Sequence, residues 1–243
     1  MHFHLPKPLH GWRELLGEVG VIVIGVLIAL GAEQAVEALH NRADANDARS
    51  EINDEVVTDI TRIHQRAFAD ECVDRRLAEI DRVIDAADNV GTIHRPTWIG
   101  RPVRYAIETA RWDAASQSGR VSRLPFNWQG QFGFLYTTLR YFYEMTIAEQ
   151  QTWSELEGLS GVVRLTPDGK LRLKTAVAQA RYYNFSIRQV SNIIFDAAAK
   201  VGLHPMRRHA PPFGVCWPIT TPNNRGQAMV ALTDARERRP PGL

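Results

Sequence analysis

The sequence predicts an all-α protein with an amino-terminal transmembrane helix followed by an antiparallel bundle of three or four long helices. An uncharged apolar run near the amino terminus indicates the membrane helix, and apolar residues recurring at steps of three and four indicate the bundle. Prolines fall mostly between those periodic segments or after them, as helix boundaries require. We expect a cytoplasmic leader at residues 1–14, the transmembrane helix at 15–38, the bundle domain at 39–202 and a proline-rich tail at 203–243.

The composition indicates one folded domain with appendages. The chain has 243 residues, of which 44% are apolar and 23% charged, and this is too apolar for a disordered chain. Its formal net charge is +2, far from the strongly basic balance of a nucleic-acid-binding domain. We therefore expect no nucleic-acid partner.

The apolar run Val19–Ala32 carries no polar side chain. As a helix it spans about 21 Å, which is shorter than the ~30 Å hydrocarbon core of a bilayer. A helix extended over Leu15–Ala38 is long enough, and it places Glu18 and Glu33 near the two interfaces, where a carboxylate costs less than at the bilayer centre. We therefore expect a single-pass anchor in contact with the lipid bilayer.

Two other interpretations of the apolar run stay open. A cleaved secretory signal would use the small residues Ala29, Gly31 and Ala32 as its cleavage site, although Glu18 does not fit the positive leader of such signals. A buried helix of a soluble protein would also be apolar. The three interpretations differ in whether the run meets lipid, is removed, or packs inside the protein.

Lysine and arginine do not indicate which side of the membrane holds the main domain. Lys7 and Arg13 precede the span, and Arg42 and Arg49 follow it, so the two sides have equal numbers of basic residues. The acidic residues behind the span favour an amino terminus inside the cell. We therefore expect a bacterial inner-membrane protein whose main domain is periplasmic.

Two small residues in the span, Gly25 and Ala29, lie four positions apart. This spacing lets two membrane helices approach closely, so the pair is a candidate packing site for a homodimer. The alternative is that both residues face lipid.

The stretch Gly17–Leu30, GEVGVIVIGVLIAL, begins with a Gly-Glu pair and ends with Gly-Val-Leu-Ile-Ala-Leu. With Leu9–Arg13 ahead and Glu33-Gln34 behind, it resembles the amino-terminal signature of an uncharacterised family of small alphaproteobacterial, sphingomonad-like, single-pass membrane proteins. The resemblance implies a membrane anchor with a helical domain behind it. The resemblance implies no activity for this chain.

Behind the anchor, apolar positions from Ile52 to Ile84 recur at helical steps and predict one long helix, with a gap in the pattern at Asp70 and Glu71. Residues 92–102 contain two prolines and a glycine, which indicates a connector. Further helices are expected at 103–118, 125–159 and 167–201, the last with Thr166 as its cap.

Charge divides along the chain. Residues 33–89 contain seven Arg and fifteen acidic residues, about −8 in all, whereas residues 90–243 contain twenty basic and ten acidic residues, about +10. This asymmetry predicts that the acidic long helix docks on the basic helices, within one chain or between two. The alternative is two separately solvated faces.

The two cysteines, Cys72 and Cys216, are candidates for one disulfide that joins the tail to the bundle in an oxidising compartment. The alternative is a buried free Cys72 and an exposed Cys216. Four aromatic residues are candidates for a ligand pocket between helices, with bundle core as the alternative. They are Trp128, Tyr136, Tyr141 and Tyr183.

No constellation in the sequence supports catalysis or a cofactor. Glu37-Ala38-Leu39-His40 has the spacing of a di-iron helix motif, but such a site needs a second copy and two more glutamates. His2, His4 and His10 lie in the leader, where flanking a membrane is the simpler role. The chain contains no nucleophile elbow, phosphate loop, zincin motif or Rossmann fingerprint. We therefore expect no catalytic residue, no metal and no cofactor.

These observations favour a membrane-anchored envelope protein whose helical bundle is a non-enzymatic interaction or scaffold module. Its expected partners are the lipid bilayer, a second copy of the chain and an unknown envelope protein. The alternative is a sensory or small-ligand-binding bundle. A third class, a membrane-tethered enzyme with an unusual site, would need titratable groups that converge in a cleft.

Overall fold

The computed structural model describes residues 11–87, 91–93, 96, 98–161, 164–208 and 213–220. Helices make up most of this part of the chain, and no strand occurs in it beyond one isolated bridge between Thr92 and Arg164. The all-α fold class, with an apolar amino-terminal helix followed by a bundle, is confirmed. The α-helices are α1 (Trp12–Ala67), α2 (Asp70–Asp85), α3 (Ala110–Gln117), α4 (Phe126–Glu157) and α5 (Pro167–Lys200).

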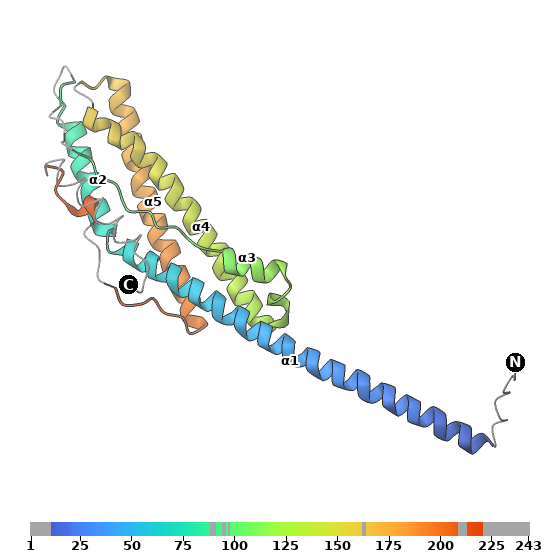
Figure 1. Cartoon of the computed structure of the whole chain (residues 1–243). Coiled ribbons are helices and arrows are strands. Elements are labelled where there is room, and N and C mark those ends of the chain that lie inside the picture. Colours follow the sequence, from blue (N-terminus) through green and yellow to red (C-terminus); the bar gives the residue numbers. More distant parts are fainter. Residues whose placement is uncertain are drawn as a thin grey trace, which may run out of the picture.

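Helix α1 has 56 residues and projects far beyond the bundle, as Figure 1 shows. At 1.5 Å per residue it is about 84 Å long. Every large apolar side chain described from Leu15 to Leu39 is exposed, and Ala45 is the first buried residue. A window with a mean hydropathy of 2.4 makes α1 long and apolar enough to cross a membrane. The interpretation of this run as a buried core helix is therefore wrong for the single chain.

The bundle consists of three arms: the second half of α1 with α2, then α4, then α5 (Figure 1). The α1–α2 arm and α4 run in the same direction, because residues 98–109 carry the chain back between them, and α5 runs antiparallel to both. The single helix expected from Ile52 to Ile84 is broken at Phe68 and Ala69, which form a turn. The break coincides with the gap in the apolar pattern, and it lets α2 bury its own apolar face. Helix α5 begins as predicted, because the Thr166 hydroxyl accepts a hydrogen bond from the amide of Gly169 at 3.1 Å.

Helix α5 packs against α2 and α4 on one side of the bundle. On the other side, residues 98–109 run as an extended segment, which we call the strap, along the bundle to α3 (Figure 1). The helix expected at 103–118 is therefore only half formed, because it begins at Ala110. The strap stays extended because side chains of α1 and α4 bind its backbone: Arg62 donates to the carbonyl of Ala106 and Gln150 to that of Pro102.

The buried apolar residues form two separate clusters. The proximal core lies nearer the projecting half of α1, and the distal core lies at the far end. On each arm a buried charged or amide side chain lies between the two cores: Arg66 in α1, Glu149 in α4 and Asn184 in α5. Proximal core residues include Ile60, Phe132, Leu139, Ile187 and Ile194. Distal core residues include Leu77, Ile80, Trp153, Leu156 and Val177.

The acidic and basic halves of the chain dock on one another, as the charge asymmetry predicted. On the outside of the bundle, Arg181 of α5 pairs with Asp81 of α2 at 2.9 Å, and Arg188 pairs with Asp74 at 3.0 Å. These groups are partly exposed, so each pair contributes about 0 to 1 kcal/mol.

Candidate functional site

A layer of charged side chains crosses the middle of the bundle. Arg66 donates hydrogen bonds to Asp70 at 2.5 Å, to Glu149 at 2.7 Å and to the Asn184 side-chain oxygen at 3.2 Å. Arg66 is 1% exposed, and Glu149 and Asn184 are fully buried. Breaking such a pair inside a protein is costly, because the remaining charge has no water to solvate it.

The layer is closed by a second set of bonds. The Asn184 amide donates to the backbone carbonyl of Asp70 at 3.2 Å and to the carboxylate of Asp74 at 2.8 Å. Burial raises the pKa of Asp70 and of Glu149, although Arg66 beside them lowers both. The bonds of the layer join α1, α2, α4 and α5, so the layer fixes how these four helices fit together.

This layer was not predicted from the sequence, although the sequence contains a signal for it. Arg66 follows Ile60 and Ile63 at helical spacing, and Glu149 lies between Met145 and Trp153 at core spacing on α4. A charged residue in phase with a buried stripe is therefore a candidate for an internal ion pair. The sequence does not say which charge each would meet.

Two buried carboxylates of α1 fasten the strap and α3. Both oxygens of Asp59 accept a hydrogen bond from the backbone amide of Glu108, each at 3.1 Å. Glu55 accepts from the amides of Arg111 at 2.8 Å and Trp112 at 3.3 Å, so it caps the first turn of α3 from another helix. Burial raises the pKa of Asp59 to about 7, even though the Glu108 amide lowers it.

The aromatic residues predicted as a pocket do not converge. Tyr136 is fully buried and donates a hydrogen bond to Glu55 at 2.7 Å, and the ring of Trp112 stacks on it at 4.8 Å. Trp128 lies 6.4 Å from Trp112 in the same cluster. Tyr141 is 50% exposed. It follows Tyr136 by five positions on α4, so the turn of the helix points its side chain about 140° away from that of Tyr136.

Tyr183, the fourth predicted pocket residue, packs at the edge of the proximal core and meets Tyr182 edge-on at 5.8 Å. The structure therefore places Trp128 and Tyr136 in one packed aromatic cluster and keeps Tyr141 and Tyr183 outside it. A shallow hollow exists elsewhere, between the strap and α4, and is lined by residues that include Arg104, Tyr143 and Gln151.

The tail is fastened to α2. Cys72 and Cys216 are joined by a disulfide, with their Cα atoms 4.7 Å apart. Next to it, Arg75 donates to the carbonyl of Cys216 at 2.9 Å and Arg76 donates to that of Trp217. The described tail segment 213–220 is therefore part of the distal core, where Phe213 and Val215 are buried.

Arg76 also binds the strap. It is 1% exposed, and its guanidinium lies 5.1 Å from the centre of the Trp98 ring. Gly100 follows with a φ of +68°, and a Cβ there would lie 2.8 Å from both Arg76 and Trp98. Strap and tail thus meet at one buried arginine.

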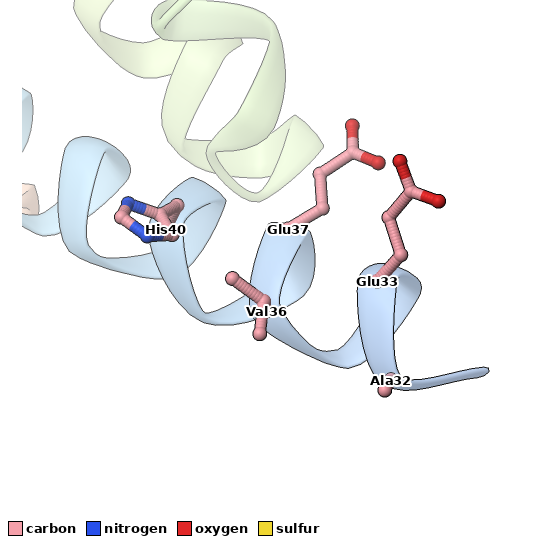
Figure 2. Close-up of a pocket in the computed structure, with 5 residues that line it drawn as sticks. All are labelled: Ala32, Glu33, Val36, Glu37 and His40. Atoms are coloured by element: carbon pink, nitrogen blue, oxygen red, sulfur yellow. The ribbon is translucent and has the colours of Figure 1, made fainter. Parts of the chain in front are cut away.

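The projecting half of α1 bears the other predicted residues. Figure 2 shows Glu33 and Glu37 reaching outward together while the ring of His40 points away from them. Among the described residues, no group of three or more His, Cys, Asp or Glu side chains could hold a metal ion. Gly25 has open space where a Cβ would lie, and the packing of Gly25 and Ala29 against a second helix stays a prediction. His2, His4 and His10 lie outside the described residues.

Comparison with known proteins gives no match: no family model, no curated protein and no solved structure matches the chain.

Proposed function

We propose that this protein is a single-pass membrane-anchored envelope protein of bacteria, and that its bundle is a non-enzymatic interaction or scaffold module. The continuity of α1 carries the proposal, because one unbroken helix joins an apolar segment to the bundle. Val21 is 72% exposed and Ile28 66% exposed within that segment. Soluble proteins rarely leave such a surface in water, whereas a bilayer covers it with hydrocarbon.

The same continuity favours a retained anchor over a cleaved signal. Ala29, Gly31 and Ala32, the small residues of the alternative cleavage site, all lie inside α1. The helix continues through them to the first buried residue, Ala45, without a turn that would expose the backbone. Removal of the segment would cut a helix in its middle.

The disulfide between Cys72 and Cys216 supports a periplasmic bundle. Disulfides persist in oxidising compartments and are rare in the cytosol, where thiols are kept reduced. A non-enzymatic role is supported by Asp59, Asp70 and Glu149, because each of these buried acids accepts a hydrogen bond from another part of the bundle. The packing of the fold therefore accounts for these three acids.

The test is a topology experiment on the full chain, with alkaline phosphatase or a green fluorescent protein fused in turn after Leu243. We expect phosphatase activity in the membrane fraction and a Cys72–Cys216 disulfide on a non-reducing gel. A fluorescent fusion with free thiols would overturn the periplasmic assignment. A product found only in the soluble fraction would overturn the anchor.

A sensory bundle is the second candidate. The observation in its favour is that α1 runs without interruption from the apolar segment to Arg66, so that a change at the buried layer would move the anchor. A ligand would have to bind outside the aromatic cluster, because Trp128 and Tyr136 are buried there. A thermal-shift screen of small molecules on the detergent-solubilised protein tests this candidate, and no stabilisation by any compound would count against it.

A further inference from the structure

One exposed stripe of α5, between Leu171 and Gln189, carries no charge. Six exposed positions follow one another at steps of four, three, four, three and four residues. Leu171 is 69% exposed, Tyr182 62% and Phe185 57%. The six positions, which we call the outer seam, are Leu171, Thr175, Ala178, Tyr182, Phe185 and Gln189.

Between Leu171 and Gln189 the charges of α5 lie beside this seam and not on it, and Asp168 and Asp196 lie in line with it beyond its two ends. Lys174, Arg181 and Arg188 flank it on the side of α2, where each is bound by an aspartate of α2. The opposite face of α5 is buried against α2 and α4. The outer seam is therefore a second, uncharged face with three large apolar side chains, on a helix whose first face already forms the core.

We propose that the outer seam pairs with the same seam of a second copy of this chain, in parallel. Alternating steps of four and three are the spacing at which two helices keep a shared apolar seam in register. The parallel direction rests on the proposed function in one respect, because two copies anchored in one membrane project the same way. α5 of each copy then runs from its Pro167 end back towards the membrane.

The flanking charges distinguish the two directions of pairing. In a parallel pair, each flanking residue faces the position five residues later in the other copy. Lys174, Arg181 and Arg188 would then face Gln179, Ser186 and Ile193, none of which is charged. In an antiparallel pair the same three cations would face one another, and like charges at close range repel, in part offset here by their aspartate partners on α2. Charge therefore favours the parallel pair.

The area offered is sufficient for a tethered dimer. An aromatic side chain buries about 150 to 250 Å². At the three exposed fractions above, and with Thr175, Ala178 and Gln189 also exposed, the six positions present on the order of 600 Å² per copy. Two copies would bury about 1,200 Å², the lower end of the range for specific interfaces. Confinement to one membrane raises the effective concentration and compensates for this modest area.

Single-cysteine crosslinking tests the pair directly. Both native cysteines are in the disulfide, so an introduced cysteine is the one free thiol among the described residues. Ala178→Cys and Gln189→Cys place it on the seam. Gln151→Cys is the matched control, because Gln151 is exposed on α4 beside the strap, in the hollow with Arg104.

The full-length protein is treated in its membranes with a short thiol-specific crosslinker. We expect a product of twice the 27.4 kDa chain mass for both seam variants and none for Gln151→Cys. In a parallel pair every seam residue lies next to the identical residue of the other chain. In an antiparallel pair identical residues lie next to each other at one point only. No dimer at either seam position, a dimer at only one of them, or a crosslink to a protein of another mass would overturn the proposal.

A disrupting variant gives the second measurement. Tyr182→Glu together with Phe185→Glu, made in the Ala178→Cys protein, puts charge on the seam without touching the core. We expect the dimer to become roughly 100-fold less stable, so that crosslinking through the cysteine at position 178 is lost. Phe126→Glu, at the 90% exposed start of α4, is the control and leaves the dimer intact. Unchanged crosslinking in the double variant would refute the seam. The phosphatase fusion reports separately on the anchor, so failure of the seam and failure of the proposed function are distinguishable.

Discussion

The two halves of the bundle are held together by different means. The distal half has a covalent fastening: the Cys72–Cys216 disulfide, with Arg76 bound to both the tail and Trp98 of the strap. The proximal half has none. There, two carboxylates of α1, Glu55 and Asp59, bind backbone amides of α3 and the strap.

This difference means that the two halves respond to different conditions. The distal half depends on redox potential, because reduction removes its fastening. The proximal half depends on pH, because burial raises the pKa of Asp59 to about 7. The charged layer around Arg66 belongs to both halves, so its loss should weaken the whole bundle.

The largest effect is expected for Arg66→Leu. The substitution leaves Glu149 and Asp70 as buried carboxylates without their cation. We expect the free energy of unfolding to fall by about 3 to 5 kcal/mol. Urea unfolding of the detergent-solubilised full chain, followed by circular dichroism, measures it.

Arg123→Leu is the matched control for that experiment. Its partner Asp44 is about half exposed and lies outside the buried layer, so the pair contributes about 0 to 1 kcal/mol. If both leucine variants lost equally little, the buried layer would not couple the two halves.

The next effect is expected on removal of the disulfide by Cys72→Ala with Cys216→Ala. A crosslink over a sequence separation of 144 residues restricts the unfolded chain. We expect a loss of about 2 to 4 kcal/mol. Hydrogen exchange should show faster exchange in α2 and in residues 213–220 than in the first half of α4. Uniform acceleration along the chain would contradict the division into two halves.

The smallest effect is a pH dependence that resides in the proximal half. In the folded chain Asp59 keeps its proton up to about pH 7, whereas the reference pKa is 3.8. The stability it contributes is therefore full below about pH 4 and is lost as the pH rises towards 7. Relative to Asp59→Asn, the native chain should gain about 1 kcal/mol in unfolding free energy for each pH unit lowered between 6.5 and 4.5.

Urea midpoints of the two proteins at pH 4.5, 5.5 and 6.5 measure that difference. Other carboxylates titrate in both proteins and cancel. Asp44→Asn is the control, because Asp44 is exposed in its pair with Arg123. A constant difference between the native chain and Asp59→Asn across this range would show that Asp59 titrates normally.

Much of the architecture was predictable because helical periodicity is local. The apolar run, the arms formed by α4 and α5, and the Thr166 cap all depend on residues within a few positions of one another. The strap was not predictable in this way. Residues 103–109 have a composition compatible with a helix, but Arg62 and Asp59, more than forty positions earlier in the chain, bind their backbone instead.

Of the candidate sites, the cysteine pair was visible in the sequence because two cysteines allow one intramolecular bridge. The four aromatic candidates could be identified from the sequence, but their positions relative to one another could not. Trp128 and Tyr136 lie in one cluster only because Trp112, on α3, stacks on Tyr136 and lies beside Trp128. Burial of an aromatic side chain follows from helix spacing, whereas its neighbours depend on how helices cross.

The sequence thus specified the apolar helix, the helical arms and their acidic and basic character, because periodicity and charge are properties of short segments. The fold alone brought Arg66 to Glu149, 83 positions away, and to Asn184, 118 positions away. The same holds for Glu55 and Asp59, which bind the strap and α3 across the bundle. Partners so distant in the chain are selected by packing, because burying a charge is tolerable only where three helices deliver its counter-charge and hydrogen bonds together.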